Sequence, residues 1–143
     1  TNVIPSEAKL MGTFRAMNEE WRFKAHELIK NICIETGKIS GADIDIKIDV
    51  GYPFVLNNTE LTEMAKRKAQ EFAGANNVEE TEMRMGAEDF AFYSHIIPAC
   101  FFRLGVGNIK NNITSGVHTP TFNIDEKAIE NGMGIMAWLA VSM

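Results

Sequence analysis

The sequence has 143 residues, of which 45% are hydrophobic and 23% charged, and its formal net charge is −5. This length fits one ordinary domain or two small ones, with enough apolar side chains for a hydrophobic core. The acidic balance excludes the basic footprint of a nucleic-acid-binding protein, and no basic run predicts docking on anionic lipid. No apolar stretch reaches the roughly 18 residues of a membrane span.

The two ends of the chain and its cysteines indicate where the protein works. The first residues, TNVIPSEAK, lack the basic start and apolar centre of a signal peptide. Cys33 and Cys100 have apolar neighbours, so we expect two buried thiols in a cytoplasmic protein, with a disulfide as the alternative. The chain begins without methionine and ends within an apolar helical pattern, which we interpret as a piece of a longer protein.

The first third of the chain predicts a strand, a helix and a second strand. Residues 7–16 alternate apolar with polar side chains, which is typical of a half-buried strand. Asn18 is a good N-cap for a helix with an apolar stripe, and Gly37 is a candidate for its end. Residues 43–50 alternate strictly, which predicts a second strand. This order predicts an α+β layer, a sheet with helices on one face.

The remaining two thirds predict a different kind of layer. The Gly-Tyr-Pro sequence after residue 50 predicts a domain boundary between Gly51 and Asn57. Helical spacing extends over residues 59–74, and the final helix is expected to begin near residue 123 or 125. The apolar run 99–106 between them fits a strand that is buried on both faces, as in an α/β sheet.

His118 is the first candidate for chemistry, because it lies on a loop between the predicted buried strand and the final helix. Ligand sites of α/β sheets gather beyond the carboxyl ends of strands, and Pro120 stiffens this loop. A fixed imidazole suits metal ligation, although an ordinary loop histidine is the plainer interpretation. His26 and His95 have no ligand spacing to another His, Cys or carboxylate.

Other candidate site residues are charged or amide side chains. Glu88 and Asp89 either occupy the first turn of a short helix, or one of them lies beside His118 and orients it or a metal ion. Arg15 could grip a carboxylate with two hydrogen bonds, or it could be a solvated strand arginine. Asn2 is a turn residue by default and a ligand-contacting amide otherwise.

Six motifs together resemble a known family. They are NVIP at residues 2–5, GTFR at 12–15, GYP at 51–53, MGAEDFAFY at 85–93, and then FFRLGVGN and VHTPTFNIDE. In this order and spacing they resemble the C-terminal half of the M20 metallopeptidase and amidohydrolase family. The nearest branch holds hippurate hydrolases, N-acyl-amino-acid amidohydrolases and auxin-conjugate hydrolases. The resemblance covers nearly the whole chain.

The resemblance implies an α/β protein with two domains. Residues 1–51 would be the C-terminal half of a lid or dimerisation domain, an α+β sandwich whose four-stranded sheet carries helices on one face. Residues 52–143 would be the C-terminal part of a mixed-sheet catalytic domain that holds two divalent metal ions, zinc or manganese. The implied partners are a small N-acyl amino acid or peptide substrate and, through the lid, a second copy of the chain. Neither nucleic acid nor a membrane is an expected partner.

The resemblance also implies roles for single residues. His118 matches the family's C-terminal metal ligand, and Glu88 matches a catalytic position near the metal centre. The residues that match substrate-binding positions are Asn2, Arg15, Gly105 and Gly107. The other metal ligands, and the glutamate pair that supplies the general base, belong to the N-terminal half of the family and have no match in this sequence. We therefore expect the 143 residues alone to be inactive.

Alternatives remain at this point. A dipeptidase or carboxypeptidase of the same family would use the same metal chemistry, because the acyl pocket decides between these substrates. A non-enzymatic dimerisation or small-molecule-binding module is the alternative from another class, since an exposed strand at residues 43–50 could pair with a second copy.

Overall fold

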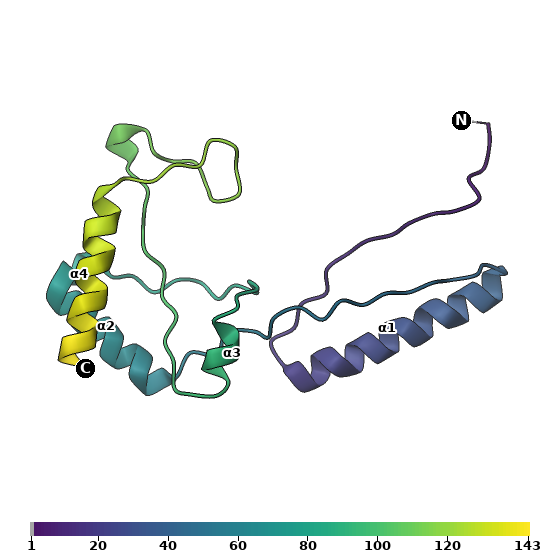
Figure 1. Cartoon of the computed structure of the whole chain (residues 1–143), viewed down its shortest axis with the longest axis horizontal. Coiled ribbons are helices and arrows are strands. Elements are labelled where there is room, and N and C mark those ends of the chain that lie inside the picture. Colours follow the sequence, from purple (N-terminus) through teal and green to yellow (C-terminus); the bar gives the residue numbers. More distant parts are fainter. Residues whose placement is uncertain (1) are drawn as a thin grey trace.

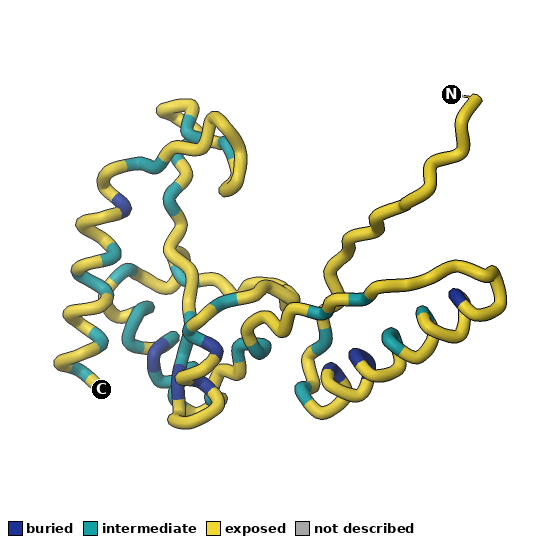
Figure 2. The backbone as a smooth tube through the Cα atoms, turned by 45° about the vertical axis from the view of Figure 1, so that its right-hand side comes forward, coloured by how far each residue is buried: buried dark blue, intermediate teal, exposed yellow. Residues whose placement is uncertain are grey.

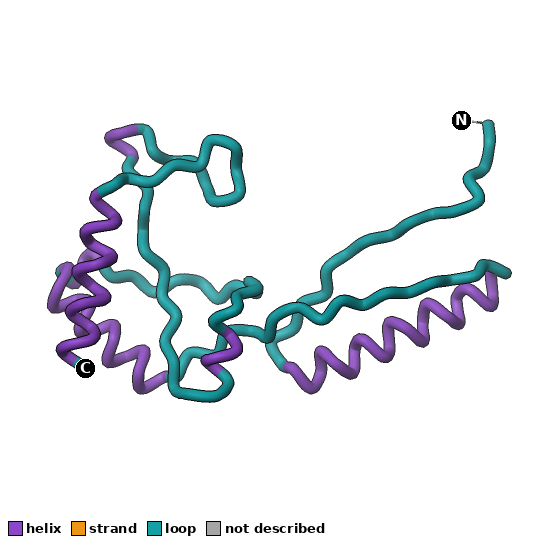
Figure 3. Tube along the Cα trace, in the orientation of Figure 1, coloured by secondary structure: helices purple, strands orange, loops and turns teal. Residues whose placement is uncertain are grey.

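The computed structural model describes residues 2–143, and its regular structure is helical (Figures 1 and 3). The order is α1 (Glu19–Ser40), α2 (Thr59–Ala73), η1 (Ala75–Asn77), α3 (Ala91–Ser94), η2 (Ile109–Asn111) and α4 (Lys127–Ser142). The only β-pairing within these residues is one isolated antiparallel bridge, between Asn108 and Ile113. No helix of the described chain is both long and apolar enough to cross a bilayer.

Helix α1 begins where the sequence predicts and ends later. The side chain of Asn18 accepts a hydrogen bond from the Trp21 backbone N–H at 2.8 Å, which is a standard N-cap. The helix continues through Gly37 to Ser40, and Gly41 caps it in the left-handed conformation, with φ 69°. Gly37 serves packing instead, because a Cβ there would lie 2.8 Å from the Ala42 carbonyl oxygen. The predicted end at Gly37 is therefore wrong.

The predicted sheet is absent from the described residues. Segments 7–16 and 43–50 are extended, and the second runs back along α1 in Figure 1, but neither forms a strand ladder. In the first segment both alternating faces are open, since Leu10 is 95% and Met11 is 86% exposed. A strand needs a neighbour to satisfy its backbone N–H and C=O groups, and residues 2–143 provide none here.

Helices α2 and α4 pack against each other and form the main helical contact. Gly134 allows this approach, because a Cβ there would meet the Phe72 ring at 2.5 Å, and Gly132 admits the 99–106 run to α4, because a Cβ there would meet Leu104 at 2.8 Å. The run 99–106 crosses this region without sheet partners (Figure 3), and Phe102 remains 41% exposed. The prediction of a strand buried on both faces is therefore wrong for the described chain.

Burial is sparse throughout (Figure 2). The buried hydrophobic side chains are all alanines: Ala25, Ala65, Ala91, Ala99 and Ala128. The accessible surface is 12066 Å². A compact monomer of 16.0 kDa would expose about 7,400 Å². Cys33 and Cys100 are free and half-buried. The large core that the composition predicts is not formed by these residues alone, because their apolar faces do not meet.

Asn58 provides a test of how much local capping supports this open fold. Its side chain accepts from the Leu61 backbone N–H at 2.9 Å and caps α2. We expect Asn58→Ala to lower the free energy of unfolding by about 1 kcal/mol, because one half-buried backbone N–H at the helix end loses its acceptor. Urea denaturation of the chain measures this change. Asn58→Asp keeps an acceptor and should stay close to wild type, so an equal loss in both variants would contradict the capping role.

Candidate functional site

His118 lies at the tip of a small closed loop, residues 115–122. The hydroxyls of Ser115 and Thr121 are hydrogen-bonded at 2.8 Å and close the base of the loop. Inside it, the Thr119 hydroxyl donates to the Gly116 carbonyl at 2.8 Å, and the Phe122 N–H donates to the Thr119 carbonyl at 3.1 Å. The loop is thus fixed by its own hydrogen bonds.

The backbone of His118 is unusual as well. Its φ is 65°, in the left-handed region that non-glycine residues seldom adopt. Such strain costs on the order of 1 kcal/mol and is concentrated at functional sites. The imidazole is exposed, so it is accessible to a ligand. The interpretation of this loop as a rigid carrier of the imidazole therefore agrees with its geometry.

A second set of contacts ties the loop region to the start of α4. The side-chain amide of Asn108 donates to the Asp125 carboxylate, and the Lys127 backbone N–H donates to the same group at 3.1 Å. The Asp125 backbone N–H donates to the Val106 carbonyl at 2.8 Å. The amide of Asn108, followed by the Lys127 N–H, lowers the pKa of the Asp125 carboxyl. Asp125 is thus the anchor between the 108–113 turn and α4.

The two glycines predicted to admit substrate backbone differ in their surroundings. A Cβ on Gly107 would lie 3.3 Å from the Ile113 carbonyl oxygen, so a glycine there lets the 108–113 turn close. A Cβ on Gly105 would meet no atom within 4 Å. Gly107 thus has a structural reason for its lack of side chain, and Gly105 borders open space.

Glu88 stands directly before α3. It is half-buried, and its carbonyl accepts from the Ala91 N–H at 3.2 Å, which starts the short helix. Asp89 does the same for the Phe92 N–H at 3.0 Å. The short helix expected at this acidic pair is present, with His95 as its C-cap, but it begins after the pair, so Glu88 and Asp89 do not occupy its first turn.

Arg15 is brought to this motif by a long-range contact. Its guanidinium donates to the Met85 carbonyl at 3.0 Å, across 70 residues of sequence. The structure therefore joins Arg15 to the segment that carries Glu88. Asn2 lies exposed at the beginning of the described chain.

His118 does not lie with Arg15 and Glu88. The 115–122 loop lies away from α3 in both Figure 1 and Figure 2. Two hollows of the described chain, about 410 and 340 Å³, are lined by residues 34–44 and by residues 56–59 with 94–98. Neither contains His118, Arg15 or Glu88. The separation of His118 from Arg15, Glu88 and these hollows is, by itself, what the alternative of a non-enzymatic dimerisation or binding module predicts.

The described side chains could provide a single metal ligand but not a complete metal site. Across residues 2–143 no three His, Cys, Asp or Glu side chains lie close enough to hold a metal ion. A catalytic zinc takes three protein ligands. His118 qualifies as a single donor because it is exposed on a loop fixed by its own hydrogen bonds. A metal site that used His118 would therefore need further ligands from outside the described residues.

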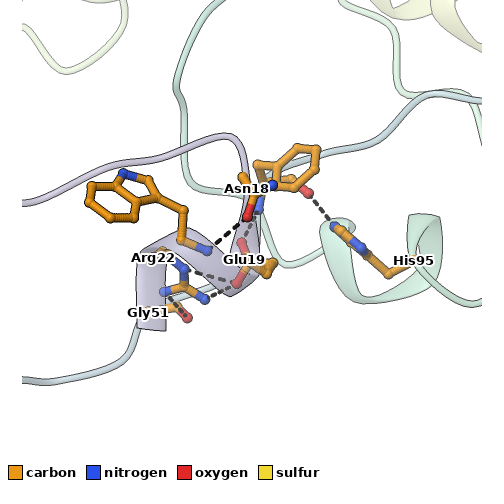
Figure 4. A network of polar contacts seen from close by, with 7 residues as sticks. Asn18, Glu19, Arg22, Gly51 and His95 are labelled. Carbon is orange, nitrogen blue, oxygen red and sulfur yellow. Dashed lines mark hydrogen bonds and ion pairs between the residues drawn. The ribbon is translucent and has the colours of Figure 1, made fainter. Parts of the chain in front are cut away.

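Sequence reasoning missed a polar network at the start of α1 (Figure 4). Arg22 is buried, and its Nε donates to the Glu19 carboxylate at 2.9 Å. The other Glu19 oxygen accepts from the Phe54 backbone N–H at 3.3 Å, and the Phe54 carbonyl accepts from His95 Nε2 at 2.7 Å. The i,i+3 spacing of Glu19 and Arg22 was a visible signal. Nothing in the sequence indicates the contact with His95.

Comparison with known proteins then identifies the class. Residues 5–142 match the profile of peptidase family M20/M25/M40. The match covers nearly the whole chain, so the chain belongs to this family of hydrolases, as its motifs predict. No solved structure matches the chain.

Individual relatives are similar over the same region. The chain is 33% identical to thermostable carboxypeptidase 2 of Saccharolobus solfataricus over 98% of its own length and 35% of that protein. It is 30% identical to the IAA-amino acid hydrolase ILR1-like 6 of Arabidopsis thaliana, over 97% of the chain and 31% of the relative. It is 36% identical to an N-acetyldiaminopimelate deacetylase of Exiguobacterium sibiricum, over 90% and 33%. The chain thus spans about a third of the length of these relatives.

The anchor at Asp125 generates a prediction about pH. Folding lowers the pKa of the Asp125 carboxyl, so its ionised form stabilises the folded chain at pH values above the unfolded pKa of about 3.9. This stabilisation is lost as the pH falls through the lower pKa of the folded state. We expect Asn108→Ala to raise the pKa of the Asp125 carboxyl toward its ordinary value and to loosen the turn. NMR titration of the carboxyl carbon measures this. The control is Asn77→Ala, which removes a remote side-chain amide that donates to the Ala73 carbonyl. An unchanged pKa of Asp125 in Asn108→Ala would contradict the role of the Asn108 amide at this carboxylate.

Proposed function

We propose that these residues are the C-terminal part of a metal-dependent amidohydrolase that cleaves the amide bond of N-acyl amino acids or small peptides. Residues 1–51 belong to a lid and residues 52–143 to a catalytic domain. Two features support this division: membership of the M20 family, and the extended segments 7–16 and 43–50, which lack strand partners. They fit two strands of a four-stranded sheet whose other strands come from elsewhere in the full-length protein.

The proposed substrate class rests on what the relatives have in common. Their names describe a carboxypeptidase, an amino acid conjugate hydrolase and a deacetylase of an acetylated amino acid. Each of these activities hydrolyses an amide bond next to an amino acid. A carboxypeptidase is the second candidate, favoured by the 33% identity to the Saccharolobus enzyme over 98% of the chain.

The observation that carries the proposal is the backbone of His118. An exposed imidazole in left-handed conformation, on a loop closed by its own hydrogen bonds, is fixed in direction before any ligand arrives. Pre-organised donors of this kind suit metal ligation. His118 therefore supplies one ligand of a two-ion zinc or manganese site, and the remaining ligands lie outside these residues.

The other candidate residues have distinct roles in the proposed reaction. Bound metal ions would lower the pKa of a water molecule and polarise the amide carbonyl. Glu88 serves as a carboxylate near the metal centre, while Arg15, with Asn2, binds the substrate's carboxylate. Gly105 and Gly107 leave room for the substrate backbone. Because the general base and most ligands lie elsewhere, the 143 residues alone are inactive.

Dimerisation through the lid and a cytoplasmic location stay predictions. The exposed apolar surface of residues 1–51 is compatible with burial against other parts of the protein or against a second copy.

The test of the metal role is His118→Ala in the full-length protein. We expect the rate of hydrolysis of a panel of N-acyl amino acids to fall by roughly a hundredfold or more, together with loss of one bound metal ion. Mutation of residues that only hydrogen-bond to a metal ligand already lowers metal affinity or activity roughly 10–100-fold. Turnover assays and metal analysis measure both. Val117→Ala on the same loop is the matched control. Undiminished turnover with full metal content in His118→Ala would exclude His118 from the site.

The test of substrate binding is Arg15→Ala. The guanidinium can pair with a carboxylate but not with a neutral amide, so KM should rise roughly tenfold for carboxylate-bearing substrates and much less for their amides. Steady-state kinetics on both substrate forms separate the two. Lys9→Ala removes another cation from the same side of the segment and should leave both KM values unchanged. Equal effects of Arg15→Ala on acids and amides would contradict the carboxylate contact.

A further inference from the structure

The linker of residues 51–54, Gly-Tyr-Pro-Phe, is held from one side by the first turn of α1. The Glu19 carboxylate accepts the Phe54 N–H at 3.3 Å, and Arg22 Nη1 approaches the Gly51 carbonyl at 3.5 Å. Arg22 and Glu19 are also paired with each other, and Arg22 is 8% exposed. Both ends of the linker are therefore bonded to one ion pair, in which Arg22 is buried and Glu19 half-buried.

The other side of the linker is held by α3. The Tyr52 ring packs edge-on against Phe92, with ring centroids 5.9 Å apart, and Phe54 packs edge-on against His95 at 4.9 Å. His95 Nε2 lies 2.7 Å from the Phe54 carbonyl oxygen; a carbonyl only accepts, so this nitrogen is the donor. Figure 4 shows His95 reaching toward the linker from α3.

These contacts remove the freedom expected of a glycine-containing linker. Pro53 fixes its own φ, and the residues on either side of it are packed on α3. A rotation of residues 1–51 about the linker would expose the Arg22–Glu19 pair or break the His95 bond. A buried ion that loses its partner is strongly destabilising, so the network resists such a rotation.

We propose that Glu19, Arg22 and His95 are positioning residues that fix the orientation of residues 1–51 relative to α3. Their effect reaches the site through Arg15. Arg15 precedes α1 by a few residues and donates to the Met85 carbonyl at 3.0 Å, in the segment that leads through Glu88 into α3. The network therefore sets where the Arg15 guanidinium stands relative to Glu88. The orientation itself follows from the contacts, whereas its consequence for catalysis rests on the proposed function.

The orientation is tested by a distance measurement that needs no activity. Spin labels on Cys33, in α1, and on Cys100, after α3, report the separation across the linker; any other cysteine of the full-length protein is replaced by serine. His95→Phe keeps an aromatic ring but removes the donor, and His95→Gln keeps a donor. Arg22→Met removes the buried cation. Lys30→Met breaks the exposed Lys30–Glu27 pair on the same helix and is the control.

We expect one narrow distance in wild type, His95→Gln and Lys30→Met, and a second population at a different distance in His95→Phe and Arg22→Met. Should Arg22→Met fail to fold, as judged by circular dichroism, His95→Phe decides alone. A wild-type distribution in His95→Phe would overturn the proposal. An equal change in Lys30→Met would also overturn it, because the effect would then be a general loosening of α1.

The catalytic consequence is tested separately by a double-mutant cycle in the full-length enzyme. His95→Phe should raise KM for a carboxylate-bearing substrate about tenfold, and this effect should disappear in an Arg15→Ala background, because the two changes act through the same group. Additive effects would overturn the route through Arg15. A full-length protein without hydrolytic activity would refute the proposed function, while the distance measurement would still decide the orientation.

Discussion

The ion pair between Glu19 and Arg22 is the interaction on which the arrangement of the chain depends. Arg22 is one of few buried charged side chains, and its partner carboxylate also accepts the backbone N–H of Phe54. A buried guanidinium is stable only when its donors are satisfied, so the start of α1 and the linker are constrained to stay together. His95 extends this constraint to α3. In this way a few polar contacts connect two halves that share little apolar contact.

The small buried area explains why polar contacts matter so much here. The buried hydrophobic side chains are alanines, whereas large apolar residues such as Ile32 and Met133 stay 64% and 63% exposed. Hydrophobic burial normally dominates folding, at roughly 25 cal/mol for each Å² removed from water. With so much apolar surface uncovered, specific hydrogen bonds and caps decide which segments lie side by side. The length of the chain, about a third of its relatives, accords with partners for these surfaces elsewhere in the full-length protein.

The candidate site shows the same division between local and distant determinants. The loop of His118 is built from hydrogen bonds within eight residues, so its closed shape and its left-handed tip are already present in this chain. The approach of Arg15 to Met85 depends on the linker network instead. Neither of these sets of hydrogen bonds joins the 115–122 loop to α3. A complete metal centre therefore requires groups that this chain does not contain.

The sequence by itself determined where α1 and α2 begin, the presence of a short helix near Glu88 and the family, because caps and motifs act within a few residues. It predicted strands at 7–16, 43–50 and 99–106 from alternation and apolar runs, yet these segments remain unpaired. Alternation reports only which residues suit a half-buried surface, and a sheet forms only when a neighbouring strand is present. The tertiary structure alone decided that Gly37 serves packing, that Gly134 admits the Phe72 ring, and that His95 holds the linker. The contacts of Gly134 and His95 join distant parts of the chain, and that of Gly37 depends on how the chain turns back after α1, so no local pattern encodes them.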